Sequence, residues 1–392
     1  MRLLFIVDAF FPYGVAISSR VRSFCSLFVS MGFNVHVIAL NTYEQGIMPG
    51  QIKEFENYTY EIVSKKNRGT FSTFCGDVSL IRAVRHDLEI HSTNFILSTA
   101  CFPYFSTLIK TAKKYNIPYY VEQCEWHDVS SYKFGRFDLR YIRANQLRNG
   151  GYKKANGIIS ISRLLDEHYK SIGVPSIRIP TILNVRGKSL PNRRENGERI
   201  SLVYTGNPGL SKEFLCPVIE CLARNDRLKK RIVFHIFGPK EKSVLDNIGG
   251  NESLLKAAGD SVIIHGKVPQ DEIPGILLNA DYQLFLRPNR KSSNAGFPTK
   301  LGESMAVGTP VIANDTGDIS LYLKDGINGF LLDRNTVDEV EMVFERLLSI
   351  DKNEYLKMRK CARETAENAF DYRSYMEEVK DFLNLTKTGK RQ

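Results

Sequence analysis

A predicted helix start that follows a strand and a loop is the part of this chain best suited to chemistry. Pro298 precedes Thr299, from which the spacing predicts a helix to Val307, and Gly308 then ends it. The first turn of a helix exposes unpaired N–H groups and a partial positive charge, which together favour phosphate binding. Because Lys300 adds a full positive charge there, the sequence predicts an anion site.

Glu303 lies one helical turn beyond Thr299, on the face that a ligand would reach past its phosphates. A carboxylate at this position can accept hydrogen bonds from a ribose diol. The alternative interpretation is that Glu303 is a surface residue that pairs with Lys300, three positions before it on the helix. Spacing leaves both interpretations open.

Three further polar segments follow predicted strands of the second half, namely 206–212, 238–242 and 266–269. In open parallel sheets, ligands bind beyond the carboxyl ends of the strands. Glycines in these loops would let a ligand approach the backbone closely, although glycine after a strand is also ordinary turn chemistry. Lys212 and Arg287, together with Lys300 and the helix start, are candidates to stabilise a departing diphosphate.

The sequence holds no D-x-D segment and no cluster of His, Asp and Glu at metal-ligand spacing. We therefore expect neither a metal nor another cofactor, and a metal-independent reaction.

Strands and helices alternate along the whole chain, which predicts an α/β fold of two parallel-sheet units. Residues 1–186 form the first expected domain, 187–199 a charged linker, and 200–370 the second domain. Residues 371–392 are expected to be a helix that packs back on the first domain, with a disordered tail. Helices are predicted over 18–31, 107–115, 141–155, 212–225, 337–348 and 355–385. Strands are predicted at the apolar runs LLFIVDAF, NVHVIAL, FILSTA, PYYVEQC, GIISIS, ISLVYTG, IVFHIFG, VIIHG, YQLFLR and TPVIAN.

The net charge of +11 is concentrated in the first half of the chain. Residues 1–190 hold 24 Lys and Arg against 14 Asp and Glu, a balance of +10. A surface of this kind attracts nucleic acid, acidic lipid or a diphosphate-bearing substrate. The basic residues lack the aromatic interleaving of a single-strand binder, so a nucleic-acid partner is not expected.

The chain has no apolar run long enough to span a membrane, and its apolar start contains Asp8 and Pro12, unlike a signal peptide. Seven cysteines without a C-x-x-C pair favour reduced thiols in the core. Together these features predict a cytoplasmic protein.

The second half resembles the donor-binding half of glycosyltransferase family 4. The resemblance is carried by VYTGNPGLSKEF, IVFHIFGP, HGKVPQDEIPGILLNADYQLFLRP, GFPTKLGESMAVGTPVIANDTG and DGINGFLL, in the family's order and spacing. The first half resembles the family more loosely, through its first strand with Gly14 and through ANGIISIS. The resemblance implies the GT-B fold of two facing Rossmann-like domains with a cleft between them. It also implies transfer of a sugar from a nucleotide diphosphate, usually with retention at the anomeric carbon.

The resemblance also implies residue roles. Lys212 matches the lysine that holds the diphosphate, and Glu303 matches the second glutamate of the family's Glu-x7-Glu pattern, on the ribose. Lys267 and Val268 fall where the base is contacted. The residues expected at the donor are Gly14, Gly206, Asn207, Lys212, Gly238, Lys267, Val268, Arg287, Asn294, Phe297, Pro298, Thr299, Lys300 and Glu303.

Two positions depart from the family pattern. The first glutamate of the pattern is replaced by Ala295, which leaves Asn294 as the nearest substitute at the donor sugar. The arginine that often precedes the lysine is replaced by a GNPG turn. Arg287 or Lys300 is then expected to supply the missing charge.

On the acceptor side, Glu125, His127 and Asp128 follow a predicted strand, and Trp126 lies among them. His127 is the candidate to assist deprotonation of the acceptor, so the expected catalytic set is Lys212, Arg287 and His127. A structural histidine is the equal alternative. Tyr13 and Arg20 are weaker candidates.

These features predict a retaining, metal-independent glycosyltransferase of bacterial surface polysaccharide or lipid-linked glycan assembly. A UDP-sugar is the favoured donor and a glycan or lipid-linked molecule the expected acceptor, at the inner face of the cell membrane. Two alternatives stay open: a nucleotide-sugar epimerase of the same fold, and an inactive nucleotide-sugar-binding protein, which Ala295 permits.

Overall fold

The computed structural model describes residues 1–14, 16–43, 46–64, 78–100, 103–129, 132–187, 199–209 and 212–387. The chain divides into two compact units, Met1–Asn184 with Tyr372–Gln392, and Val185–Asp371. Most of the expected linker, residues 188–198, lies outside the described residues. Residues 388–392 of the expected disordered tail lie outside them too.

The first unit is built on an eight-stranded sheet with the order β3-β4-β2-β1-β5-β6-β7-β8. Neighbouring strands are parallel except for the antiparallel pair of β3 and β4 at one edge. The interior strands are buried on both faces, which explains their continuous apolar runs. The strands are β1 (Arg2–Phe10), β2 (Asn34–Asn41), β3 (Lys53–Phe55), β4 (Tyr58–Ile62), β5 (Phe95–Thr99), β6 (Tyr119–Gln123), β7 (Gly157–Ser160) and β8 (Ser176–Arg178).

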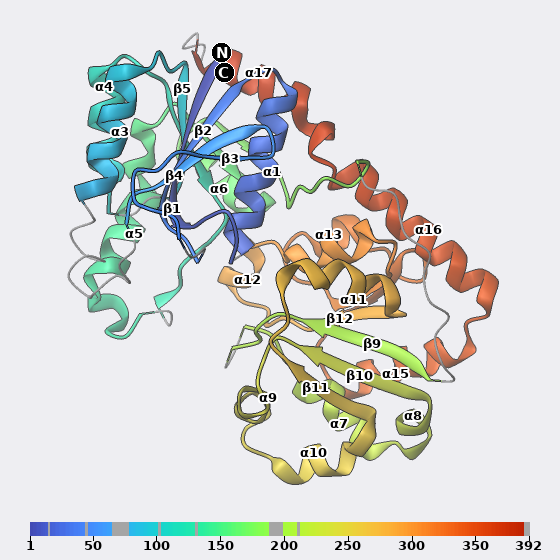
Figure 1. Ribbon diagram of the computed structural model, residues 1–392. Coiled ribbons are helices and arrows are strands. Elements are labelled where there is room, and N and C mark those ends of the chain that lie inside the picture. The colour runs from blue at the N-terminus through green and yellow to red at the C-terminus, as the bar shows by residue number, and fades with distance from the viewer. Residues whose placement is uncertain are drawn as a thin grey trace. The chain divides into compact units, whose positions relative to one another are not determined.

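Helices cover both faces of this sheet (Figure 1). In α1, Val21, Phe24 and Phe28 are fully buried at a helical spacing and join the core formed with the strands. The helices of the first unit are α1 (Ala16–Ser30), α3 (Val78–Ile90), α4 (Phe105–Lys114), α5 (Leu139–Asn149), α6 (Arg163–Ser171) and α17 (Met376–Lys387).

The last helix, α17, packs on the first sheet although it comes from the end of the chain. The ring centroids of Phe382 and Tyr120 lie 5.9 Å apart, and the Tyr120 hydroxyl lies 2.7 Å from Thr386 Oγ1. A Cβ on Gly157 would lie 2.4 Å from the Phe382 ring. Glycine on β7 therefore makes room for the helix.

The second unit contains a six-stranded parallel sheet with the order β11-β10-β9-β12-β13-β14. Helices α11 and α13 lie on one face, and α7, α8 and α15 on the other (Figure 1). The strands are β9 (Ile200–Thr205), β10 (Ile232–Phe237), β11 (Val262–Gly266), β12 (Tyr282–Phe285), β13 (Val311–Asn314) and β14 (Gly329–Leu332). The helices are α7 (Cys216–Arg224), α8 (Asp226–Arg231), α9 (Glu241–Asn247), α10 (Glu252–Ala258), α11 (Ile273–Asn279), α12 (Lys291–Ala295), α13 (Thr299–Ala306), α14 (Ile319–Tyr322), α15 (Val337–Ser349) and α16 (Lys352–Ala369).

The helix predicted to begin at Lys212 begins at Cys216, so that prediction was wrong at its start. The backbone N–H of Phe214 donates to Leu286 O, and that of Leu215 donates to the side chain of Asn247. These tertiary hydrogen bonds hold the segment in a loop. Lys212 therefore lies in a turn that precedes the helix.

Two other predicted helices are interrupted. The helix predicted over 355–385 breaks after Ala369, because the Asp371 carboxylate accepts hydrogen bonds from the N–H groups of Val185 and Arg186. The helix predicted over 141–155 runs over Leu139–Asn149 and ends at Gly150, and a 3-10 turn follows it. Among the described residues, no helix is long and apolar enough to cross a membrane.

Candidate functional site

Three glycines connect the carboxyl ends of β9, β10 and β11. The N–H of Gly206 donates to Phe237 O at 2.9 Å, and that of Gly238 donates to Gly266 O at 2.7 Å. A Cβ on Gly238, whose φ is +116°, would lie 2.1 Å from Gly206 O. Glycine at 238 is therefore required by the close approach of two loops to each other, before any ligand is considered.

The side chain of Lys300 runs from the first turn of α13 to the end of β9. Its ammonium forms an ion pair with the carboxylate of Glu213 and lies 3.3 Å from the hydroxyl of Tyr204. A Cβ on Gly206 would lie 3.0 Å from Lys300 Cε. Glycine at 206 therefore leaves space for the lysine. This ion pair joins residues 87 positions apart, whereas the alternative interpretation of Glu303 paired Lys300 with a residue on the same helix.

Glu213 and Tyr204 were not singled out from the sequence, and both are buried. The Tyr204 hydroxyl donates to Glu213 Oε2 at 2.5 Å. Burial raises the pKa of the Tyr204 phenol well above its usual value, and the neighbouring Glu213 charge raises it further. The phenol is therefore a fixed hydrogen-bond donor. The only signal in the sequence was that Glu213 directly follows Lys212.

Burial lowers the pKa of Lys300, and the charge and hydrogen bond of Glu213 oppose that effect. The positive charges of Lys212 and Arg287 also lower the pKa of Lys300, so the three cations lie close enough to interact. Three cations and the carboxylate of Glu213 thus act on one another in this cluster, which leaves an excess of positive charge among these four groups. Such a cluster favours an anionic ligand.

Arg287 is the least compensated member of this cation cluster. Its side chain is 7% exposed, and Nη1 has no hydrogen-bond partner. Burial lowers its pKa, and the charge of Glu213 opposes that effect. The backbone of Arg287 is held firmly, because its N–H donates to Asn314 Oδ1 at 2.7 Å and its carbonyl accepts from Asn314 Nδ2 at 2.9 Å.

Asn207 and Lys212 lie in the loop after β9. The Asn207 side chain accepts a hydrogen bond from the N–H of Gly209 at 3.0 Å, which closes a turn. The Lys212 N–H donates to Pro208 O at 3.1 Å, and its side chain is exposed. Residues 210 and 211 lie outside the described residues.

Several residues predicted around the α13 start have structural partners. Asn294 Oδ1 accepts from the N–H of Gly317 at 2.9 Å, and its Nδ2 donates to Asn289 at 2.9 Å. The ring of Phe297 packs against Tyr322 and Phe370. Ala295 is fully buried. The Asn294 amide and the Phe297 ring therefore both contribute to the packing of this region.

Pro298 is buried and directly precedes Thr299, the first residue of α13. Glu303 is half-buried, one turn along the same helix. Lys267 is exposed and Val268 half-buried, directly after β11. The structure thus places these residues near strand ends or on the helix that begins at Thr299.

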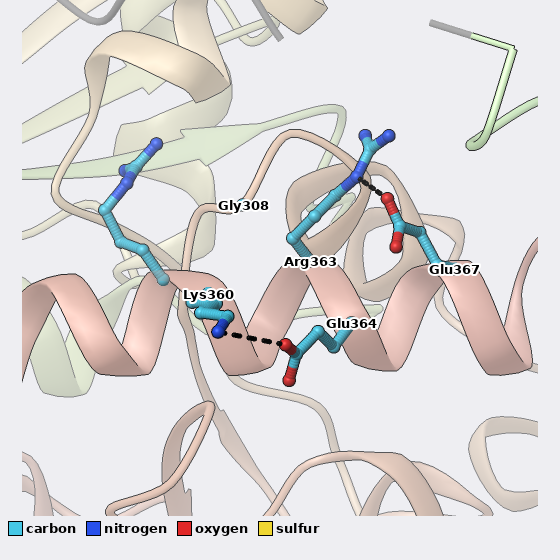
Figure 2. A pocket seen from close by; sticks show the side chains of 6 residues that line it. Gly308, Lys360, Arg363, Glu364 and Glu367 are labelled. Atoms are coloured by element: carbon cyan, nitrogen blue, oxygen red, sulfur yellow. Dashed lines mark hydrogen bonds and ion pairs between the residues drawn. The ribbon is translucent and has the colours of Figure 1, made fainter. Parts of the chain in front are cut away.

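The opposite end of α13 is held by arginines of α16. Arg363 donates to the carbonyl of Ala306, and Arg359 donates to that of Val307 at 3.4 Å. Figure 2 shows the Arg363–Glu367 and Lys360–Glu364 ion pairs on the surface of α16, beside a pocket of about 350 Å³. This pocket lies at the carboxyl end of α13, away from Thr299. Its arginines complement the negative end of the helix dipole.

The acceptor-side candidates lie in the first unit. His127 is 44% exposed, and its Nε2 lies 3.6 Å from Glu125 Oε2. Trp126, expected beside an acceptor, is instead 9% exposed, because the Arg148 guanidinium lies 3.9 Å from its ring centroid and His168 packs edge-on.

The loop that holds Gly14 is covered by an aromatic ring. A Cβ on Gly14, whose φ is +120°, would lie 2.2 Å from the Tyr43 ring, which stacks on Phe10 at 3.8 Å. Arg20, a weaker candidate, is instead buried in an ion pair with Glu122 at 2.6 Å.

A known family model matches most of the second unit. Residues 214–367 match the family model described as glycosyl transferases group 1. These residues belong to that family. The group 1 domain includes Arg287, Thr299, Lys300 and Glu303, whereas Lys212 and Glu213 directly precede the matched region. No curated protein matches the chain.

Solved structures share the fold over nearly the whole chain. Sucrose-phosphate synthase from Thermosynechococcus elongatus has 12% identity and a TM-score of 0.75, and covers 99% of this chain and 100% of its own. WaaG, a glycosyltransferase involved in lipopolysaccharide biosynthesis, has 15% identity and a TM-score of 0.67. The match covers 97% of this chain and 98% of WaaG. Anabaena HepE in complex with UDP-glucose has 14% identity and a TM-score of 0.65. The match covers 98% of this chain and 99% of HepE. The predicted α/β, GT-B fold is therefore confirmed, and the match over residues 214–367 identifies a glycosyltransferase group 1 domain in the second unit.

Proposed function

We propose that the protein transfers a sugar from a nucleotide diphosphate sugar to an acceptor hydroxyl, with retention and without a metal ion. The observation that carries the proposal is the buried guanidinium of Arg287, whose Nη1 lacks a partner beside the Lys300–Glu213 pair. An unpaired buried charge costs several kcal/mol, on the order expected for desolvation of an ion. A diphosphate would supply the missing partner.

In this proposal Lys212, Arg287, Lys300 and the N–H groups at Thr299 stabilise the nucleoside diphosphate as it departs. Lys300 is held by its ion pair with Glu213 and the backbone of Arg287 by Asn314, so these two need little reorganisation during the reaction. Glu303 accepts hydrogen bonds from the ribose diol. The acceptor hydroxyl attacks from the face that the diphosphate leaves, without a covalent glycosyl intermediate.

Lys267 and Val268 are proposed to contact the base, with a UDP-sugar as the favoured donor. Support comes from HepE, a protein of the same fold whose structures hold UDP and UDP-glucose. At the other substrate, His127 is proposed to assist deprotonation of the acceptor, and its Nε2 lies 3.6 Å from Glu125 Oε2.

The acceptor is proposed to be anionic and lipid-linked, at the inner face of the cell membrane. Support comes from the net charge of +10 over residues 1–190, because positive charge attracts anionic surfaces. WaaG, which shares the fold, belongs to lipopolysaccharide biosynthesis. We place the protein in the cytoplasm on this basis.

The donor proposal is tested by thermal denaturation with a panel of nucleotide sugars. A ligand at 100 times its Kd adds about 2.7 kcal/mol to the free energy of unfolding, so the true donor raises the Tm. Glu303→Ala should abolish most of this shift. Glu364→Ala, an exposed change on α16, is the matched control and should retain it. An unchanged shift in Glu303→Ala would remove the ribose role.

Turnover then separates the transferase from its alternatives. Slow release of nucleoside diphosphate that increases with an acceptor supports the transferase. A free epimer would identify an epimerase, and tight binding without turnover an inactive binding protein. Retention is read from the anomer of the product by NMR. Loss of turnover with EDTA, restored by a divalent cation, would overturn metal independence.

A further inference from the structure

Three large apolar side chains are exposed within six residues of the first unit. Phe134 is 66% exposed, Phe137 is 88% exposed and Leu139 is 55% exposed. They lie on the 3-10 turn Gly135–Phe137 and at the start of α5. Single exposed apolar residues are normal on a protein surface, whereas a group of them marks an interaction site.

Within residues 129–154 the charges are almost all positive, and the acids Glu125 and Asp128 lie just before this segment. Residues 129–154 contain seven Lys and Arg and one acid, Asp138. The Asp138 side chain is 4% exposed, because it caps α5 and bonds to Arg140 at 2.7 Å. Arg148 is buried against Trp126. The exposed charges are therefore cations, and they are Lys133, Arg136, Arg143, Lys153 and Lys154.

We infer that residues 132–143, with Lys153 and Lys154, form a surface that docks on a bilayer containing anionic lipids. This aromatic-basic surface would insert Phe134 and Phe137 among the headgroups while its cations bind the lipid phosphates. The inference rests on the proposed membrane partner and assigns it to named residues.

The ring geometry favours a bilayer over a single-stranded nucleic acid. The ammonium of Lys133 lies 5.8 Å from the Phe134 ring centroid, over one face of the ring. This leaves one face of the Phe134 ring for base stacking, whereas insertion among headgroups requires only the apolar body of the ring. Phenylalanine also lacks the hydroxyl or N–H that tyrosine and tryptophan bring to a protein interface.

The test is flotation of the full chain with vesicles of phosphatidylcholine alone or with about one third phosphatidylglycerol. We expect binding to the anionic vesicles only, and release as salt rises. Lys133→Gln with Arg136→Gln should weaken binding about thirtyfold, since each basic residue contributes about 1 kcal/mol near such a surface. Phe134→Ser with Phe137→Ser should weaken it at least about tenfold.

Matched double variants on the second unit control for altered charge or hydrophobicity. Lys352→Gln with Lys357→Gln, and Met342→Ser with Leu356→Ser, change exposed residues of α15 and α16 and should bind as the native chain does. Circular dichroism and the Tm show that each variant is folded. Equal binding to neutral vesicles, or retained binding in both surface variants, would overturn the inference.

Three further outcomes are decisive. If the native chain binds a single-stranded oligonucleotide and no vesicle, the surface is a nucleic-acid site and the inference is wrong. If a nucleotide sugar raises the Tm while vesicles fail to bind, this inference falls and the donor proposal stands. If the chain binds vesicles and no nucleotide sugar raises its Tm, the docking inference stands and the donor proposal falls.

Discussion

Each unit of the molecule buries an arginine beside a glutamate, and the two arginines differ in their partners. In the first unit, Arg20 donates from Nε to Glu122 at 2.6 Å, from Nη1 to Pro180 O at 2.6 Å and from Nη2 to Ile179 O at 2.9 Å. In the second unit, Arg287 is equally inaccessible, yet its Nη1 has no partner.

This difference distinguishes an arginine whose nitrogens are all bonded within the fold from one that keeps an unused nitrogen. Every nitrogen of the Arg20 guanidinium donates a hydrogen bond to the fold, and Glu122 balances its charge. Arg287 has a donor to spare in a cluster with excess positive charge. A buried charge that the fold leaves uncompensated is a candidate functional group, because a ligand can compensate it.

The largest effect is expected for Arg20→Met. The Glu122 carboxyl, 1% exposed, would lose its cation, and burial already raises the pKa of that carboxyl against the opposing charge of Arg20. Removal of one partner of a buried ion pair costs about 3–5 kcal/mol. Urea unfolding of the full chain measures this loss. A loss below about 1 kcal/mol would show that the pair contributes little to the first unit.

The same substitution at Arg287 should act on turnover and leave stability intact. Loss of a fixed donor to the departing diphosphate should lower turnover about 10²–10³-fold. The Tm should stay the same or rise, because methionine replaces an uncompensated buried charge. If Arg287→Met instead destabilises the protein as Arg20→Met does, the distinction between the two arginines is wrong.

The smallest effect is expected for Glu213→Gln, which removes the carboxylate from the cation cluster. Burial lowers the pKa of Lys300 and Glu213 opposes this, so the pKa should fall further in the variant. Lys300 would then lose its proton at a lower pH. The alkaline limb of the pH–activity profile should move to lower pH, and turnover at neutral pH should fall about tenfold.

Tyr204→Phe is the control for this shift. It removes the hydrogen bond to Glu213 and keeps the carboxylate that supports the charge of Lys300. The alkaline limb should therefore stay in place. A shift in Tyr204→Phe as large as that in Glu213→Gln would mean that packing of the cluster, and not the charge of Glu213, sets the titration of Lys300.

Much of the fold follows from local pattern. The apolar runs predicted β1, β2, β5, β6, β7 and the strands from β9 to β13, because a parallel strand buried on both faces is apolar throughout. The strands β3, β4 and β8 were missed because polar residues interrupt them, and β14 was missed as well. Helix ends were misplaced where long-range hydrogen bonds fixed them, as at Cys216 and Asp371.

The sequence by itself determined the chemical types at the candidate site: a helix start at Thr299, the cations Lys212, Arg287 and Lys300, and the carboxylate of Glu303. Its motifs also indicated the fold and the family of the second unit. Only the tertiary structure decided how these groups are paired. Lys300 meets Glu213 across 87 residues, and Arg287 is buried with an unused donor. Pairing at such separations depends on which strand ends meet and on burial, which local spacing does not encode.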